Sequence, residues 1–217
     1  MKKIIVAILV CIIVFGLTAC NENQPSDSSS EQNTEFSNPS GTPGGNDLQN
    51  LNQKLDFVGH SISYPSNGNV RNSDYGKSIS CGSEYFLLVE APAAAGESFT
   101  VKDLDEAVGS CEQYICRSLE SKLLHLFASG NTKQNIKSTS DETINGIKMK
   151  KVVGTFLNVS TNTEVNYVGY YFLSDVMSYF LSESEGAVYP VYIVCIDADA
   201  NNTSVEDFIG NIIKTVN

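Results

Sequence analysis

Apolar and polar residues alternate in several stretches of the chain, and this period of two predicts β-strands. Residues 57–64 (FVGHSISY) alternate in this way until a Pro-Ser-Asn-Gly sequence ends the strand. Residues 78–91 predict a second strand region that is broken or bulged at Gly82. Residues 136–157 predict a hairpin, because the Asn-Gly pair inside "TINGIKM" is the strongest short hairpin signal.

Two more strands follow. Residues 164–173 (EVNYVGYYFL) and 187–196 (AVYPVYIVCI) are rich in Tyr and Val. Pro190 lacks a backbone N–H and therefore predicts an edge position or a bulge for the second of them. The intervening residues 174–186 are ambiguous between a short strand and a helical turn.

A spacing of three and four residues between apolar positions predicts a helix of about six turns over residues 104–126. Lys122 is the one residue that departs from its apolar stripe. Thr100 is the expected N-cap of this helix, with Asp103 three residues later in the capping-box position.

A second amphipathic helix is expected at the C-terminus, between Val205 and Val216, with Thr203 and Glu206 as its capping box. Two strand regions, a helix, about four antiparallel strands and a helix predict an α+β domain. We expect an αβα sandwich in which two helices cover a central antiparallel sheet.

The first nineteen residues have a different pattern. Lys2 and Lys3 precede an uncharged apolar run over residues 4–17. Its length lies between that of a signal peptide and that of a membrane span. An uncleaved anchor helix is the alternative to a signal peptide, and both place the protein at a membrane.

The sequence Leu17-Thr18-Ala19-Cys20 ends this run and resembles a bacterial lipobox. The resemblance implies attachment of diacylglycerol to the Cys20 thiol and cleavage before Cys20. Several acyl chains hold a protein to a bilayer much better than one chain does. We therefore expect a lipoprotein on the extracytoplasmic face of a cell membrane, with residues 1–19 as its signal peptide.

Residues 20–53 are rich in Asn, Gln, Ser, Gly and Pro and contain five acidic residues but no basic one. Such a stretch cannot bury enough apolar surface to fold. We interpret it as a flexible linker with a reach of roughly 30 Å. Its composition favours a single-membrane, Gram-positive bacterium. Residues 54–217 then form one domain of ordinary size.

The protein is strongly acidic. Its formal net charge of −11 becomes −13 when residues 1–19, with two lysines and no acid, are removed. An acidic protein without clustered Lys and Arg has no surface for the phosphates of nucleic acid. An anionic membrane would also repel it, so the acyl chains on Cys20 must hold it there.

Several phrases and their order resemble the PsbP-like domains of small bacterial lipoproteins, a family of mostly uncharacterised exported proteins. The matching phrases are "SISYPSNGNV", "LDEAV", "TINGIKMKKVVGTF", "VNYVGYYFL" and "FIGNIIKTV". The resemblance implies the αβα sandwich and carries no catalytic motif. The tryptophan that the family usually has after the Pro-Ser-Asn turn is replaced by Gly68, and the chain contains no Trp.

Candidate metal ligands are few. His60 and His125 are the only histidines, whereas one zinc site usually takes three or four ligands. The stretch "DADANNTSVED" places Asp197 and Asp199 at alternate positions of a calcium loop, but it lacks the required Gly and the bidentate Glu. A looser cation site and a polar turn remain the two interpretations. We expect no bound metal and no cofactor.

Four cysteines lie in the expected domain, namely Cys81, Cys111, Cys116 and Cys195. Cys111 and Cys116 point away from one another on a helix and cannot form a disulfide. A bridge between Cys81 and Cys195, or from Cys111 to either, stays open beside the alternative of four buried free thiols.

The remaining features are surface patterns. Lys148, Lys150 and Lys151 form the one basic cluster, interpreted either as a solvated hairpin face or as a patch for an anionic polymer. The tyrosines of the later strands are expected to pack on the sheet with their hydroxyls at its margin; they are Tyr167, Tyr170, Tyr171, Tyr179, Tyr189 and Tyr192.

Two hypotheses for function follow. The first is a non-enzymatic, lipid-anchored binding or accessory protein with a protein or small ligand as its partner. The second is a cell-envelope enzyme whose site assembles from scattered residues such as His60, Asp197 and Asp199. A solute receptor of a transporter is disfavoured, because such receptors usually need two lobes and a longer chain.

Overall fold

The structure is a computed structural model that describes residues 50–73, 76–91, 100–127, 130–175, 189–199 and 204–217. The chain divides into two compact units, Met1–Ser40 and Gly41–Asn217, and all described residues belong to the second. The first described strand begins at Leu51, three residues before the expected start of the domain at Lys54. Residues 1–19 and Cys20 lie outside the described residues.

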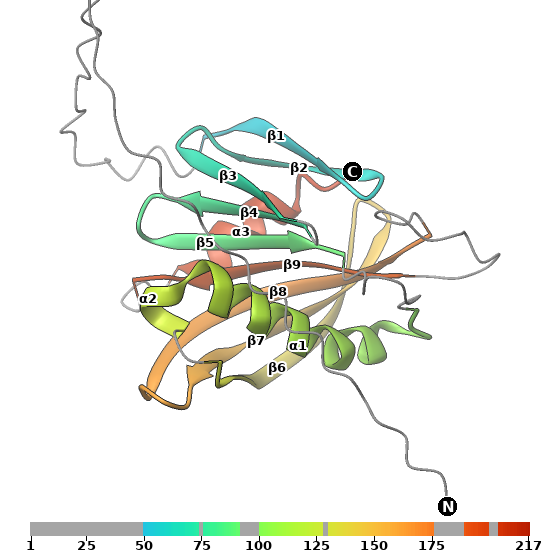
Figure 1. Cartoon of the computed structure of the whole chain (residues 1–217). Helices are drawn as coiled ribbons and strands as arrows, with labels where there is room; N and C mark the ends of the chain where they lie inside the picture. The colour runs from blue at the N-terminus through green and yellow to red at the C-terminus, as the bar shows by residue number, and fades with distance from the viewer. Residues whose placement is uncertain (1–49, 74–75, 92–99, 128–129, 176–188, 200–203) are drawn as a thin grey trace, which may run out of the picture. The chain divides into compact units, whose positions relative to one another are not determined.

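Seven strands form one antiparallel sheet in the order β3-β4-β5-β9-β8-β7-β6 (Figure 1). The strands are β3 (Gly68–Ser73), β4 (Gly76–Cys81), β5 (Tyr85–Glu90), β6 (Thr132–Ile144), β7 (Ile147–Asn158), β8 (Thr163–Ser174) and β9 (Tyr189–Asp197). A separate two-stranded hairpin consists of β1 (Leu51–Phe57) and β2 (His60–Pro65). Consecutive strands pair with one another except β2 with β3 and β5 with β6.

Each face of the large sheet carries its own apolar core. Helix α1 (Leu104–Lys122) and the short α2 (Leu124–Phe127) pack on one face, where Leu88 of β5 is buried. Helix α3 (Val205–Ile213) and the β1–β2 hairpin pack on the other, where Leu87 is buried. All nine residues of β9 are buried because it lies in the middle of the sheet. The expected α+β class is confirmed.

The Asn-Gly hairpin is confirmed. Asn145 and Gly146 connect β6 and β7 with φ angles of 52° and 83°, which are those of a type I′ turn. The strand expected at 164–173 is also confirmed as β8. The break at Gly82 is a hairpin turn between β4 and β5, and Gly82 takes the positive φ of 63° that this turn needs.

One strand prediction was wrong, and a second holds at the residue but not for the whole strand. Residues 57–64 do not form one strand, because Val58 and Gly59 turn the chain between β1 and β2. Pro190 is not on an edge strand of the sheet, since β9 lies between β5 and β8. The pairing of β9 with β5 begins only at Tyr192, however, so Pro190 has a neighbouring strand on one side alone. A proline is tolerated at such a position.

The expected N-cap and end of the first helix were also wrong. Asp103, not Thr100, is the N-cap of α1, and its carboxylate accepts a hydrogen bond of 2.9 Å from the Glu106 N–H. The helix ends at Lys122 instead of continuing unbroken to Leu126, and α2 follows as a separate turn. Ser204 precedes α3 without a side-chain capping bond, and the predicted cap Thr203 lies outside the described residues.

Candidate binding pocket

The tip of the β1–β2 hairpin has a strained turn. Val58 and Gly59 have φ angles of 43° and 74°, so both adopt the left-handed conformation of a type I′ turn. This conformation costs an L-residue about 1–2 kcal/mol, and a β-branched residue is especially unsuited to it. Val58 is half-buried and packs against the core on the α3 side of the sheet, and this packing holds the turn in place.

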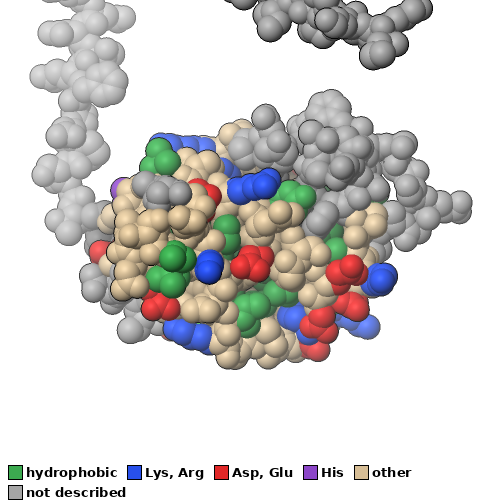
Figure 2. Space-filling model, turned by 60° about the horizontal axis from the view of Figure 1, so that its bottom comes forward, with side chains coloured by type: hydrophobic (Ala, Val, Ile, Leu, Met, Phe, Trp, Pro, Cys, Tyr) green, Lys and Arg blue, Asp and Glu red, His purple; other side chains and the backbone are tan. Residues whose placement is uncertain are grey.

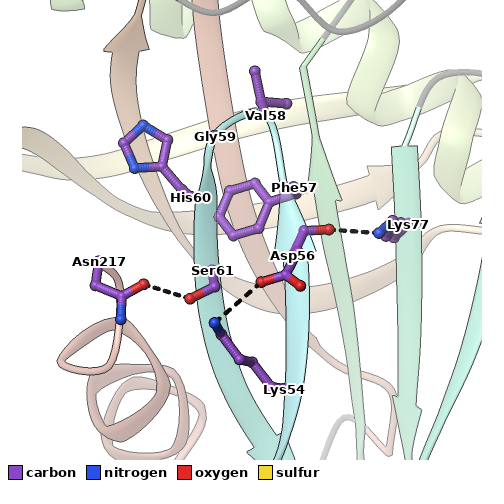
Figure 3. Close-up of a pocket in the computed structure, with 9 residues that line it drawn as sticks. All are labelled: Lys54, Asp56, Phe57, Val58, Gly59, His60, Ser61, Lys77 and Asn217. Atoms are coloured by element: carbon purple, nitrogen blue, oxygen red, sulfur yellow. Dashed lines mark hydrogen bonds and ion pairs between the residues drawn. The ribbon is translucent and has the colours of Figure 1, made fainter.

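A pocket of about 590 Å³ lies beside this tip (Figure 3). Its volume is within the range of small-ligand sites. The lining comes from β1, β2, the start of β4 and the C-terminal segment, and consists of Lys54, Asp56, Phe57, Val58, Gly59, His60, Ser61, Lys77 and Asn217.

Charged groups meet at Asp56. The Lys54 ammonium lies 3.3 Å from the Asp56 carboxylate, and the Lys77 ammonium donates to the Asp56 carbonyl oxygen at 2.5 Å (Figure 3). Lys77 thereby ties the hairpin to β4 of the large sheet. The side chains of Lys54 and Asp56 are 64% and 78% exposed, so this ion pair contributes at most about 1 kcal/mol and remains open to a ligand.

Aromatic rings form the apolar part of the pocket. Phe57 and His60 are directly opposite one another in the hairpin. The imidazole of His60 lies edge-on to Phe172 of β8, with ring centres 5.1 Å apart and planes at 89°. Such an arrangement is the preferred geometry of aromatic pairs. His60 therefore packs the hairpin on the sheet and lines the pocket at the same time.

Ser61 bonds to the C-terminal segment and not to His60. Its backbone N–H donates to the Asn217 carbonyl at 3.0 Å, the Asn217 N–H returns a bond of 3.2 Å, and the Ser61 hydroxyl donates to the Asn217 side-chain oxygen. Consecutive residues of a strand point to opposite faces. The hydroxyl and the imidazole consequently do not form a nucleophile–base pair, which would require hydrogen-bond contact between them.

A second groove of about 830 Å³ lies between the start of α1 and the end of the β6–β7 hairpin. Lys150 crosses it, with its ammonium 2.6 Å from the Asp105 carboxylate and 3.0 Å from that of Asp141. Hydrogen bonds to these two carboxylates raise the pKa of Lys150. The positive charge of Lys150 is thus already balanced by the carboxylates of Asp105 and Asp141.

The basic cluster therefore does not form a free positive patch. Lys151 points to the opposite face of the sheet from Lys150 and pairs with Glu206 of α3. Of the three lysines, Lys148 alone is fully exposed. On the face shown in Figure 2, Lys and Arg are interspersed with Asp and Glu, without a large area of one sign.

The residues suggested for an enzyme site are not brought together. His60 packs on Phe172, which is opposite Val191 near the start of β9, whereas Asp197 is its last residue. Six residues of strand separate these two positions by about 20 Å. Asp199 donates its N–H to Asp197 at 3.2 Å in a local turn. No cluster of three or more His, Cys, Asp or Glu suited to a metal occurs in the described residues.

The structure excludes the disulfides that the sequence left open. Cys81 and Cys195 lie in the core on the α3 side, and Cys111 and Cys116 lie in the core under α1. Strand β5 separates the strands of Cys81 and Cys195, which places their backbones about 10 Å apart. A disulfide needs less than about 7 Å between Cα atoms. All four are free, buried thiols.

One charged site was missed by sequence reasoning. Glu90 of β5 is buried under α1, where its carboxylate accepts bonds from Lys122 at 2.7 Å, from Ser118 at 2.9 Å and from the hydroxyl of Tyr192. The sequence feature that could have revealed this site is Lys122. It departs from the apolar stripe of α1 because its ammonium reaches the Glu90 carboxylate. These three partners of the Glu90 carboxylate lie on α1 and β9, so the network links the helix to the sheet.

The tyrosine prediction was partly wrong. Tyr167, Tyr171 and Tyr192 are buried with their rings in the core under α1, not with hydroxyls at the sheet margin. Gln134 of β6 donates to the hydroxyls of Tyr167 and Tyr171 at 2.6 and 3.3 Å. Tyr179 lies outside the described residues.

Comparison with solved structures gives likenesses in fold, whereas comparison by sequence does not. No protein-family model matches the chain, and no curated protein matches it either. The chain is similar to the cyanobacterial PsbP protein (CyanoP) from Synechocystis sp. PCC 6803, with 12% identity and a TM-score of 0.44. The match covers 83% of this chain and 99% of that chain. Among the described helices, none is long and apolar enough for a membrane span.

Proposed function

We propose that the protein is a lipid-anchored, extracytoplasmic binding or accessory protein without catalytic activity. In this proposal residues 1–19 are the signal peptide and Cys20 carries the acyl chains. Residues 20–53 then link the domain to the outer face of the membrane of a Gram-positive bacterium. The membrane is one partner of the protein, and a protein or small ligand at the domain is the other.

We further propose that the domain is a PsbP-like αβα sandwich. Two kinds of observation support this: the order of the five matching phrases in the sequence, and the packing of α1 and α3 on opposite faces of an antiparallel sheet. Proteins of one fold differ in function, so the fold does not supply the ligand.

The observation that supports binding over catalysis is the arrangement at the hairpin pocket. The pocket offers aromatic rings and exposed charged groups at Lys54 and Asp56, which are suited to contact with a ligand. Its hydroxyl, on Ser61, is bonded to Asn217 and has no base beside it. The pocket can hold a molecule but does not activate a nucleophile.

The anchor is tested in the producing cell by labelling with radioactive palmitate. We expect the wild-type chain to carry label and to sediment with membranes, and the Cys20→Ala variant to lose the label. Extracellular protease added to intact cells should degrade the labelled protein. Unlabelled protein in the cytosol, or equal labelling of the variant, would contradict the proposal.

The binding role is tested with a fragment library observed by ligand NMR on the purified chain in detergent. We expect some fragments to bind and to lose binding in a His60→Ala variant, because this removes one aromatic ring of the pocket. His125→Ala is the matched control, since His125 is exposed on α2 and does not line the pocket. Fragments that bind both variants as they bind the wild type would place the ligand elsewhere.

A further inference from the structure

The side chain of Asn145 joins the β6–β7 hairpin to the C-terminal segment, residues 214–217. Its amide nitrogen donates to the carbonyl oxygen of Lys214 at 2.9 Å and to that of Val216 at 2.7 Å. These two bonds use both hydrogens of the amide group. Asn145 and Lys214 are 69 residues apart in the chain, so this is a tertiary contact and not a feature of the turn itself.

The C-terminal segment is held at three further points. Val216 is fully buried in the core on the α3 side. The Thr215 hydroxyl accepts a bond of 2.7 Å from the Ser63 N–H, and Asn217 pairs with Ser61. Asn217 also lines the hairpin pocket. The contact at Asn145 therefore supports a segment that forms one wall of this pocket.

An asparagine followed by glycine is chemically labile. The backbone nitrogen of the glycine attacks the side-chain Cγ, loses its proton and forms a new C–N bond. The bond from Cγ to the side-chain nitrogen breaks, and this nitrogen takes up a proton and leaves as ammonia. Water then opens the resulting succinimide, which leaves an aspartate or an isoaspartate. Glycine favours the attack because it has no Cβ to block the approach.

We propose that Asn145-Gly146 is a site of spontaneous deamidation whose rate is controlled by the contact with the C-terminal segment. While the amide nitrogen is bonded to Lys214 and Val216, Cγ is fixed and cannot rotate toward the Gly146 nitrogen. The reaction proceeds only when the segment separates from the hairpin.

Deamidation of Asn145 is not reversed once the ammonia has left. The product carboxylate has no hydrogen to donate and carries a negative charge, so the two carbonyl oxygens repel it. An isoaspartate also lengthens the main chain by one carbon in a two-residue turn. The C-terminal segment then loses its contact with the hairpin, and Asn217 is no longer held at the pocket wall.

The chain contains a second Asn-Gly pair that serves as an internal reference. Asn67 precedes Gly68 at the start of β3, and its exposed side chain has no hydrogen bond to any described residue. The rate at Asn67 consequently does not depend on the two bonds that hold the Asn145 amide. It reports on changes that affect the whole domain.

The test measures deamidation of the full chain at 37 °C and slightly alkaline pH, by mass spectrometry of proteolytic peptides. In Val216→Ala the segment is loosened, and we expect reaction at Asn145 to become about tenfold faster, the factor that two weak hydrogen bonds supply. Val165→Ala is the matched control, because Val165 is equally buried but lies in the opposite core under α1. It should leave the Asn145 rate within about twofold, and Asn67 should be unaffected in both variants.

Equal acceleration at Asn145 in the two variants would overturn the proposal, because global unfolding would then control the rate. So would a wild-type rate at Asn145 as fast as that of the urea-unfolded chain. If Val216→Ala does not fold, Asn145→Asp gives an independent measurement. We expect hydrogen exchange at the amides of Ser61 and Asn217 to increase in it by tenfold or more, and unchanged exchange there would refute the coupling.

Discussion

Alkaline pH should unfold this domain unusually sharply, because seven buried groups cannot ionise in the folded state. They are Cys81, Cys111, Cys116, Cys195, Tyr167, Tyr171 and Tyr192. Burial raises the pKa of Cys81 from its ordinary 9.0 to about 12, and burial together with nearby Glu112 raises that of Cys116 to about 12. Burial also raises the pKa values of Cys111 and Cys195.

The three phenols are affected in the same direction. Burial raises the pKa of Tyr171 and Tyr192 well above the ordinary 10.0, and the Glu90 carboxylate adds to the effect at Tyr192. Burial also raises the pKa of Tyr167. Each of the seven groups is neutral when protonated. The unfolded chain therefore binds fewer protons than the folded chain above pH 9–10, and stability falls as the pH rises.

The size of the effect follows from these ordinary and raised values. At pH 10 each thiol reduces the free energy of unfolding by roughly 1–2 kcal/mol and each phenol by less than about 1 kcal/mol, which sums to on the order of 7 kcal/mol. A domain has a total stability of about 5–15 kcal/mol. We therefore expect unfolding between about pH 10 and 11, while the domain stays fully folded at pH 8.

The assay is urea unfolding followed by circular dichroism at pH 8 and pH 10, with a phosphine reductant to keep the thiols reduced. The free energy extrapolated to water should fall by about 7 kcal/mol between the two pH values. In Cys111→Ala one thiol is removed, and the same fall should be smaller by roughly 1–2 kcal/mol. A fall of less than about 2 kcal/mol in the wild type would refute the argument, since it would mean that the thiols ionise in the folded domain.

Three further predictions concern stability at neutral pH. Lys122→Met leaves the Glu90 carboxylate buried without a cation and should lower the free energy of unfolding by about 3–5 kcal/mol; a change below 1 kcal/mol in urea unfolding would mean that the pair is unimportant. Gly109→Ala should raise it by about 0.5–1 kcal/mol, because the new methyl group meets open space on α1. Gly154→Ala should lower the free energy of unfolding by about 3 kcal/mol or prevent folding, because the new Cβ would lie 2.1 Å from the Asn135 carbonyl oxygen. Equal melting temperatures for the two glycine variants would contradict both expectations.

Local sequence was a good guide wherever a few neighbouring residues decide the conformation. Asn145-Gly146 specifies its turn because both residues accept a positive φ. The apolar spacing along α1 and the Tyr- and Val-rich run of β8 identified elements that the structure contains. The same reasoning failed at Val58-Gly59, because valine has no local preference for the left-handed conformation and adopts it only under packing from the core.

The pocket illustrates the same division. Sequence reasoning singled out His60 as a strand residue, but it did not find Lys54, Asp56 or Lys77, since it assigned no strand before residue 57. Lys77 meets Asp56 across 21 residues of chain, and no local pattern encodes such a contact.

What the sequence determined by itself is the class of the domain, most of its later strands, its two longer helices and the expectation of a lipid anchor at Cys20. What only the tertiary structure decided is which residues meet. Glu90 and Lys122 pair across 32 residues, and the four cysteines separate onto two faces of one sheet. The reason is physical: backbone preference acts over a few residues, whereas contacts between elements depend on the order in which strands join the sheet and on which face each helix covers.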